Sequence, residues 1–207
     1  MSTHSILIIE DDVLLCNNMK LLLQLEGYDV RIANNGKIGI AALREKRPDV
    51  ILCDIMMPEM DGHSVLDAVK GEELLAEIPF IFITALGSRA EVRKGMTAGA
   101  DDYLTKPFSS DELIAAVSTR IQRSESRRNH TLQLALQREQ AILREATTER
   151  EREVLRLVGH GVTSKEIARQ LGISMRTVNA HRTNLLDKLG AENAAMLARW
   201  AVIADRI

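Results

Sequence analysis

The sequence predicts two folded parts: a doubly wound α/β domain with a five-stranded parallel sheet, and an all-α domain joined to it by a helical linker. Three observations support this fold class. Five short apolar runs alternate with helical patterns, a stretch of good helix formers without Pro or Gly follows, and short capped helices complete the chain. A length of 207 residues leaves room for two hydrophobic cores.

Strand and helix signals alternate through the first part of the chain. The predicted strands are residues 6–9, 28–33, 50–53, 79–83 and 103–105, and the predicted helices are 13–26, 35–46, 62–70, 88–98 and 109–122. Five strand–helix units in this order favour a parallel sheet with helices on both faces. We therefore assign residues 1–122 to the first domain.

Residues 123–146 are predicted to form a helical linker that continues the preceding helix, because they are rich in Gln, Glu, Arg, Leu and Ala. Leu132, Leu136 and Leu143 fall near one face of this helix. Such a face is compatible with a short coiled-coil contact between two chains, but Glu139 interrupts the heptad. A solvated spacer and a dimer contact are therefore equally compatible with the sequence.

Residues 147–207 are predicted to be entirely helical. The expected helices are 149–160, 164–171, 175–189 and 194–204, with Thr163 and Ser174 as N-caps and Gly172 at the turn. A short helix, a glycine turn and a second capped helix are typical of a helix-turn-helix. Residues 148–207 carry ten Lys and Arg against seven Asp and Glu, whereas residues 1–123 carry 13 against 19. An anionic partner is therefore expected at the second domain.

Acidic residues follow two of the predicted strands. Glu10 and Asp11 come after the run at 6–9, and Asp54 comes after the run at 50–53. Open α/β sheets place their chemistry at the carboxyl ends of the strands. Because like charges at one sheet edge repel, the site needs a cation, and hard oxygen ligands suit Mg²⁺ together with phosphate oxygens. The pattern indicates a phosphoryl-accepting aspartate beside a magnesium site.

Residues 1–122 resemble the receiver domain of two-component response regulators, which has a CheY-like fold. The matching segments are Glu10-Asp11, Asp54 in Asp-Ile-Met-Met-Pro-Glu-Met-Asp-Gly, Thr84, and Ala98-Gly99-Ala100-Asp101-Asp102-Tyr103-Leu104-Thr105-Lys106-Pro107-Phe108. The resemblance implies that Asp54 accepts a phosphoryl group from a sensor histidine kinase. It further implies that Lys106 and Thr84 contact the phosphoryl oxygens and that Tyr103 turns as a switch.

The same resemblance implies the ligands of the metal and one unusual peptide bond. Mg²⁺ would be held by Glu10, Asp11, Asp54 and the backbone carbonyl of Met56, and the Lys106–Pro107 peptide would be cis. The side chain of Met56 is apolar where a polar group would orient a hydrolytic water, so we expect slow self-dephosphorylation.

Residues 148–203 resemble the LuxR-type helix-turn-helix of the NarL/FixJ subfamily. The matching residues are Thr148-Glu149-Arg150-Glu151-Arg152-Glu153-Val154-Leu155, Ser164-Lys165-Glu166-Ile167-Ala168, Ile173-Ser174, Thr177-Val178, His181, Asn184, Lys188 and Leu189. The resemblance implies binding to double-stranded DNA. The expected base-reading residues are Asn179, Ala180 and Thr183, and the residues expected to contact phosphates or support the helix are Lys165, Thr177, His181, Arg182 and Lys188. Asn179 stands where the family usually has lysine, and its amide suits an adenine edge.

The two resemblances together indicate a phosphorylation-dependent transcription regulator that forms a homodimer when phosphorylated. No enzymatic activity beyond self-catalysed phosphoryl acceptance is expected. A cytoplasmic location without membrane insertion is expected, because the chain has no signal-peptide pattern, no long apolar run and two cysteines without disulfide or metal spacing.

Two other functions compete with this interpretation. A phosphatase of the haloacid dehalogenase type is disfavoured, because it needs a second acid at the position of Met56. The second alternative is a DNA-binding regulator that works without phosphorylation and uses its receiver only for dimerisation. The presence of Glu10, Asp11, Asp54, Thr84 and Lys106 in the receiver argues against it.

Overall fold

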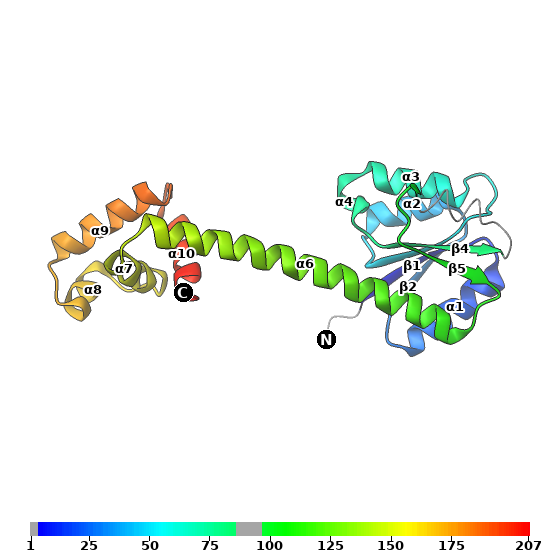
Figure 1. Cartoon of the computed structure of the whole chain (residues 1–207), viewed down its shortest axis with the longest axis horizontal. Helices are drawn as coiled ribbons and strands as arrows, with labels where there is room; N and C mark the ends of the chain where they lie inside the picture. Colours follow the sequence, from blue (N-terminus) through cyan, green and yellow to red (C-terminus); the bar gives the residue numbers. More distant parts are fainter. Residues whose placement is uncertain (1–3, 86–96) are drawn as a thin grey trace. The chain divides into compact units, whose positions relative to one another are not determined.

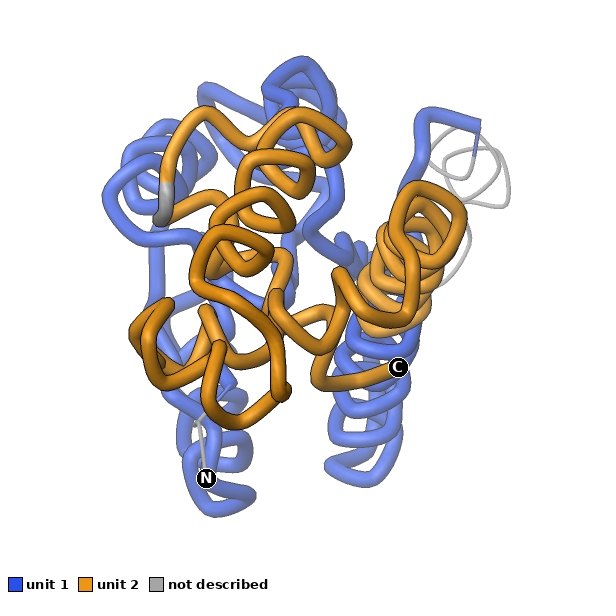
Figure 2. The backbone as a smooth tube through the Cα atoms, turned by 90° about the vertical axis from the view of Figure 1, so that its left-hand side faces the viewer, with its two compact units in different colours: residues 1–127 blue, residues 128–207 orange. Residues whose placement is uncertain are grey.

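The computed structural model describes residues 4–85 and 97–207. The chain divides into two compact units, Met1–Arg127 and Arg128–Ile207 (Figure 2). The helix that the sequence predicts at 88–98 lies almost entirely outside the described residues. Each unit is a separate structural entity with its own hydrophobic core.

The first unit contains a five-stranded parallel sheet in the order β2-β1-β3-β4-β5. Its strands are β1 (Ser5–Ile9), β2 (Asp29–Ala33), β3 (Val50–Asp54), β4 (Phe80–Ala85) and β5 (Asp102–Lys106). Every residue of β1 and β3 is buried, as expected for a parallel sheet that is covered on both faces. The predicted doubly wound sheet is therefore confirmed, with strand boundaries shifted by one or two residues.

Helices cover both faces of this sheet (Figure 1). They are α1 (Val13–Leu25), α2 (Gly36–Glu45), α3 (Gly62–Gly71), the short α4 (Glu73–Ala76) and α6 (Ser110–Ala146). Side chains of α2 and α3 pack on one face, and those of α1 and the first turns of α6 pack on the other. The sequence pattern did not predict α4, a single turn that buries only Leu75.

Helix α6 runs without a break through residues 123–146, so the predicted linker is helical. Its last turns contribute to the core of the second unit: Leu143 is fully buried there, and Leu136 and Ala146 pack against the same cluster. By contrast, Leu132 is 62% exposed. The leucines predicted to share one face therefore have different environments, and Leu143 is a core residue of the second unit.

The second unit is completed by four further helices, α7 (Glu149–Gly159), α8 (Ser164–Leu171), α9 (Met175–Lys188) and α10 (Ala194–Ala204). Thr163 and Ser174 cap α8 and α9 as predicted, since each side chain accepts a hydrogen bond from a backbone N–H in the first turn. Gly172 lies between these helices with φ +66°, a left-handed conformation that glycine adopts at little cost.

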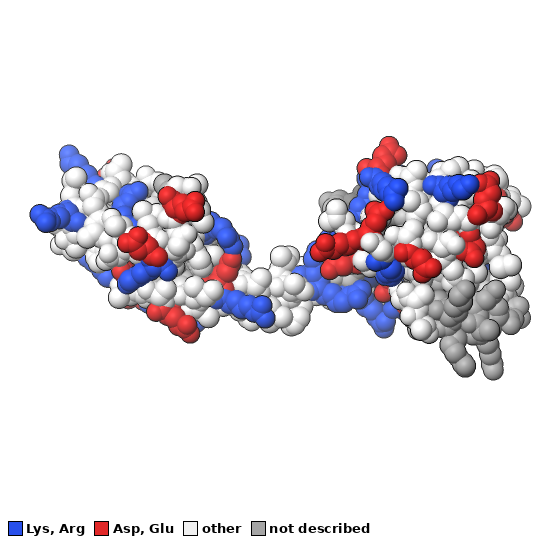
Figure 3. Space-filling model, turned by 90° about the horizontal axis from the view of Figure 1, so that it is seen from above, with Lys and Arg blue, Asp and Glu red and all other residues white. Residues whose placement is uncertain are grey.

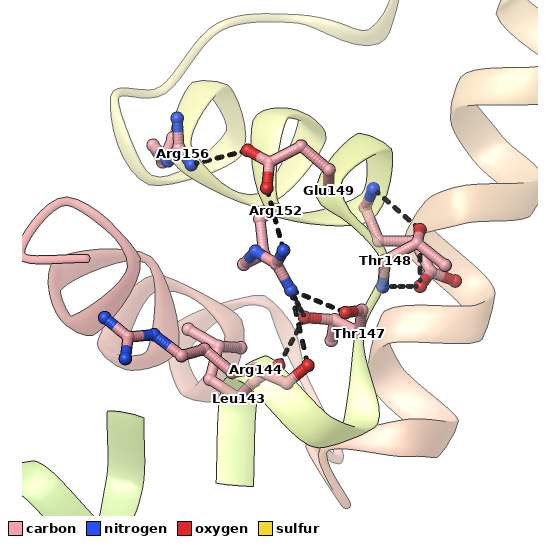
Figure 4. A network of polar contacts seen from close by, with 8 residues as sticks. Leu143, Arg144, Thr147, Thr148, Glu149, Arg152 and Arg156 are labelled. Atoms are coloured by element: carbon pink, nitrogen blue, oxygen red, sulfur yellow. Dashed lines mark hydrogen bonds and ion pairs between the residues drawn. The ribbon is translucent and has the colours of Figure 1, made fainter. Parts of the chain in front are cut away.

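A polar network joins the end of α6 to the start of α7 (Figure 4). Arg152 donates from Nη1 to the carbonyl oxygen of Thr147 at 2.6 Å and from Nη2 to Glu149 Oε2 at 2.8 Å. Its side chain is only 14% exposed. The last carbonyl oxygens of a helix have no hydrogen-bond partner within the helix. Arg152 therefore satisfies a carbonyl oxygen, that of Thr147, directly after the last residue of α6. Thr148 and Glu151 form a capping box at the start of α7.

None of the helices in residues 4–85 and 97–207 combines the length and apolar character that a membrane span requires. The two cysteines, Cys16 and Cys53, are both free and buried.

Candidate functional site

The carboxyl ends of four neighbouring strands bring the predicted receiver residues together. Glu10 follows β1, Asp54 ends β3, Thr84 lies near the end of β4, and Lys106 ends β5. The order β1-β3-β4-β5 makes these ends adjacent along one edge of the sheet. Parallel strands therefore place residues 96 positions apart in the chain, such as Glu10 and Lys106, in direct contact.

Three carboxylates and one ammonium form the centre of this site. Oxygens of Glu10, Asp11 and Asp54 lie within 4.8 Å of one another. Lys106 Nζ lies 2.7 Å from Glu10 Oε2 and 3.3 Å from Asp54 Oδ1, so it bridges two of the acids. Glu10 and Asp54 are 1% and 6% exposed, whereas Asp11 is exposed. The Cys16 thiol donates to the carbonyl oxygen of Glu10 at 3.3 Å.

Burial controls the protonation of these groups. Desolvation raises the pKa of Glu10 and of Asp54 above their ordinary values, although the Lys106 ammonium acts in the opposite direction. For Lys106, desolvation acts to lower the pKa, but the contacts with Glu10 and Asp54 outweigh it and raise the pKa. One ammonium does not compensate three carboxylates. The chemistry of these oxygen donors therefore fits a small divalent cation such as Mg²⁺.

Thr84 and Tyr103 lie beside this centre on β4 and β5. Thr84 is 3% exposed, and its hydroxyl makes a long contact of 3.4 Å with the carbonyl oxygen of Ala85. The Tyr103 ring is half-buried and stacks on Phe82 at 5.9 Å between ring centroids. Thr84 thus lies near the carboxyl end of β4, and Tyr103 lies on the neighbouring strand β5.

Other expected features of the site are also present. The Lys106–Pro107 peptide is cis, as the family resemblance implied. Met56 follows Asp54 by two positions, and its side chain is 67% exposed. The backbone of Gly62 lies close to the backbone of Asp54. A Cβ atom on residue 62 would lie 2.4 Å from the carbonyl oxygen of Asp54. Only glycine permits this close approach of α3 to β3.

The second unit presents a helix-turn-helix, formed by α8, the turn at Gly172 and α9. Ile167 on α8 and Val178 and Leu185 on α9 are fully buried and hold the two helices together. Figure 3 shows Lys and Arg side chains on this unit at the left-hand end of the view, where Figure 1 labels α8 and α9. A capped helix with an exposed face and nearby cations suits insertion into a DNA groove.

The predicted DNA-contacting residues divide into two groups by exposure. Those that are exposed and available to a partner are Lys165, Thr177, Asn179, Ala180 and Thr183, and those that are half-buried are His181 and Arg182. The Thr183 hydroxyl donates to the backbone carbonyl oxygen of Asn179 at 3.2 Å, so its proton is already engaged. Arg182 reaches Ser164 Oγ at 3.4 Å and links α9 to α8.

Lys188 has a structural partner. Its Nζ lies 2.9 and 2.8 Å from the two carboxylate oxygens of Glu151, which is 3% exposed at the start of α7. Lys188 is among the residues expected to contact phosphates or to support the helix, and the observed ion pair supports the second role. Two exposed arginines on the same helices, Arg169 and Arg176, were missing from the predicted set. Arg176 lies one turn before Ala180 and so on the same face of α9. This spacing could have predicted that Arg176 lies beside the expected base-reading residues.

Comparisons with known proteins give a matching family for each of the two parts of the chain. Residues 6–118 match the family described as response regulator receiver domain, and residues 145–201 match the bacterial regulatory proteins of the luxR family. The probable transcriptional regulator ycf29 of Pyropia yezoensis is 32% identical over 200 residues, which cover 97% of this chain and 90% of that protein.

Two further relatives resemble the first domain or the whole chain. The DNA-binding dual master transcriptional regulator RpaA of Synechocystis is 39% identical over 120 residues, 58% of this chain and 50% of that protein. The crystal structure of full-length FixJ from B. japonicum aligns over 100% of both chains with a TM-score of 0.59 and 26% identity. The chain therefore belongs to the response regulators of the NarL/FixJ subfamily, DNA-binding transcription regulators in which a receiver domain precedes a LuxR-type helix-turn-helix.

Proposed function

We propose that Asp54 accepts a phosphoryl group from a sensor histidine kinase and that the aspartyl phosphate promotes dimerisation and DNA binding. The observation that supports this most directly is the environment of Asp54. It is a buried carboxylate at the end of a central strand, 3.3 Å from the Lys106 ammonium and within 4.8 Å of the Glu10 and Asp11 carboxylates. A merely structural acid would not need two further acids at the same position.

The carboxylates of Glu10, Asp11 and Asp54 and the backbone carbonyl of Met56 are the residues that would hold Mg²⁺. When bound, the ion neutralises charge on the phosphoryl donor and on these carboxylates. A metal site of this kind keeps several waters, and the exposed Asp11 gives it access to solvent.

The residues of the chain then have distinct roles in the transfer. A carboxylate oxygen of Asp54 forms a bond to phosphorus while the phosphorus–nitrogen bond to the donor imidazole breaks, and the electron pair of that bond stays on the imidazole nitrogen. Lys106 moves its contact from Asp54 to a phosphoryl oxygen, and the Thr84 hydroxyl donates to another. Such a reaction depends chiefly on positioning and charge neutralisation, which these groups provide.

Incubation with acetyl phosphate tests this proposal without knowledge of the kinase. We expect one acid-stable, base-labile phosphoryl group per chain, formed in the presence of Mg²⁺ and not in the presence of a chelator. Mass spectrometry of the intact protein measures the incorporation, and peptide mapping locates it. Absence of incorporation with Mg²⁺, or phosphorylation of another residue, would contradict the assignment of Asp54.

In our proposal, the second domain responds to phosphorylation by binding DNA. Two phosphorylated chains would present two copies of α9 to half-sites about one helical turn apart. Affinity should fall as salt rises, because phosphate contacts release counterions. The protein would carry out both steps in the cytoplasm, where its DNA and the kinase domains of sensor proteins are accessible.

Substitution of Met56 by Asn is expected to accelerate loss of the phosphoryl group by up to about a hundredfold, the lower end of what a positioned acid–base or water-orienting group contributes. The exposed Met56 side chain lies two residues from Asp54 and offers water no hydrogen bond. The decay of phosphorylated protein after removal of acetyl phosphate measures the effect. Met56→Leu is the matched control, and equal acceleration in both variants would refute the explanation.

Substitution of Asn179 by Ala is expected to weaken binding to the cognate site by about 1–3 kcal/mol and to relax specificity at one A·T pair. The side chain is exposed on α9, and Thr183 bonds only to its backbone. Binding assays with single-base variants of the site measure the effect. Lys165→Ala is the control, for which we expect similar weakening on all sequences and a smaller salt slope.

A further inference from the structure

His63 at the start of α3 has an unusual environment. It is 9% exposed, and both ring nitrogens, Nδ1 and Nε2, are shielded from solvent without a hydrogen-bond partner among the described residues. A neutral imidazole carries one donor and one acceptor. Burial of both without partners is unfavourable, and such a group in a folded protein calls for a functional explanation.

The surroundings of His63 are aromatic and lead toward the proposed switch. The imidazole ring lies 5.1 Å from the Phe82 ring at an interplanar angle of 57°. Phe82 in turn stacks on Tyr103 at 5.9 Å and 24°. Phe82 and Tyr103 are direct neighbours in the β4–β5 register. His63, Phe82 and Tyr103 therefore form a row that runs from α3 across β4 to β5.

Tyr103 has a hydroxyl group that matches the needs of His63. It is half-buried at the margin of the core that α2 and α3 cover, and Phe82 belongs to the same core. His63 and Tyr103 both pack on the Phe82 ring, so a turn of Tyr103 into this core would bring its hydroxyl into the same aromatic cluster as the imidazole. A phenol both donates and accepts, so it can satisfy His63 in either tautomer.

We propose that His63 is the hydrogen-bond partner of the Tyr103 hydroxyl in the phosphorylated receiver, and is thus a positioning residue of the switch. This inference rests on the proposed function and on the switch role that the family resemblance implies for Tyr103, in which phosphorylation of Asp54 turns the ring inward. The imidazole has no hydrogen-bond partner among the described residues in the resting state and gains one in the active state. This difference in free energy favours the active state.

Nitrogen-15 NMR of the imidazole tests the contact in the full-length protein. Beryllofluoride with Mg²⁺ serves as the phosphoryl mimic, and His63→Leu assigns the resonance among the five histidines of the chain. We expect the His63 nitrogen shifts to move from unbonded to hydrogen-bonded values on loading, and Tyr103→Phe to prevent this change. An unchanged resonance in the loaded wild type, or an equal change in Tyr103→Phe, would overturn the inference.

Functional variants separate positioning from folding. His63→Phe retains a ring of similar shape, and we expect it to load beryllofluoride normally while its mimic-induced gain in DNA affinity falls about tenfold, the size of one net buried hydrogen bond. His63→Gln keeps a donor and an acceptor and should recover part of the gain. Equal gains in wild type and His63→Phe would refute the role. Failure of the wild type to load beryllofluoride would refute the proposed function, and this inference with it.

Discussion

Asp54→Asn is expected to lower phosphoryl incorporation from acetyl phosphate by at least about 10⁴-fold, as when a nucleophile is removed from an enzyme. The amide is nearly isosteric with the carboxylate but lacks the charged oxygen that attacks phosphorus. Because Asp54 is 6% exposed and desolvation raises its pKa, loss of its charge should not unfold the receiver. Intact mass spectrometry measures the incorporation, and thermal unfolding checks that the receiver remains folded.

Asp49→Asn provides the matched control for this substitution. Asp49 precedes the same strand, β3, at its opposite end, where its carboxylate accepts hydrogen bonds from the backbone N–H and hydroxyl of Ser5. The change removes the same charge at a distance from the site, and phosphorylation should continue at the normal rate. Continued phosphorylation of Asp54→Asn would show that another residue is the phosphoacceptor.

Glu151→Gln is expected to destabilise the second unit by about 2 kcal/mol at neutral pH, because it leaves the Lys188 ammonium without its partner. The estimate lies below that for a fully buried pair, because the Lys188 side chain is 40% exposed and water can solvate it in part. Chemical denaturation of the full-length protein, followed through Trp200 on α10, measures the effect in this unit.

Glu166→Gln is the control for the loss of the capping carboxylate. Glu166 forms the same capping box with Thr163 at the start of α8 but makes no ion pair with a lysine within residues 4–85 and 97–207. Glutamine can still cap, so we expect a change of less than about 0.5 kcal/mol. Equal destabilisation by both substitutions would show that the Glu151–Lys188 pair contributes nothing.

The same pair predicts a pH dependence. Burial alone would raise the pKa of Glu151, but hydrogen bonds from Lys188 and Thr148 outweigh it and hold the pKa below its ordinary value of 4.5. A carboxyl with a lowered pKa contributes stability that is fully present above the unfolded-state pKa and is lost as the pH falls through the folded-state pKa. Wild-type protein should therefore lose stability below about pH 4.5 more steeply than Glu151→Gln.

Local patterns in the sequence were sufficient to predict most of the fold. Apolar runs of four residues correspond to β1 and β3, and the acids that follow them, Glu10 and Asp54, lie at the sheet edge as expected. The caps Thr163 and Ser174 were predictable for the same reason, since a cap depends on residues within one turn. The single turn α4 was not predictable, because four residues are too few to show a helical period.

Contacts between distant parts of the chain were beyond the reach of the sequence. Nothing local indicates that Lys106 bridges Glu10 and Asp54, or that Lys188 pairs with Glu151. The burial of Leu143 also depends on packing within the second unit, because Leu132 and Ile142 on the same helix are similarly apolar and remain exposed. The lack of a hydrogen-bond partner for His63 within the described part of the chain is visible only when the surroundings of its ring are known.

DNA binding and oligomeric mass, measured with and without acetyl phosphate and Mg²⁺, test the central claim most directly. A pool of promoter fragments from the host provides the DNA, and wild type is compared with Asp54→Asn. We predict that acetyl phosphate drives dimerisation and specific DNA binding by the wild type and changes neither property in Asp54→Asn. Identical affinity and mass in all samples would contradict the claim and would favour a receiver that serves only as a fixed dimerisation module.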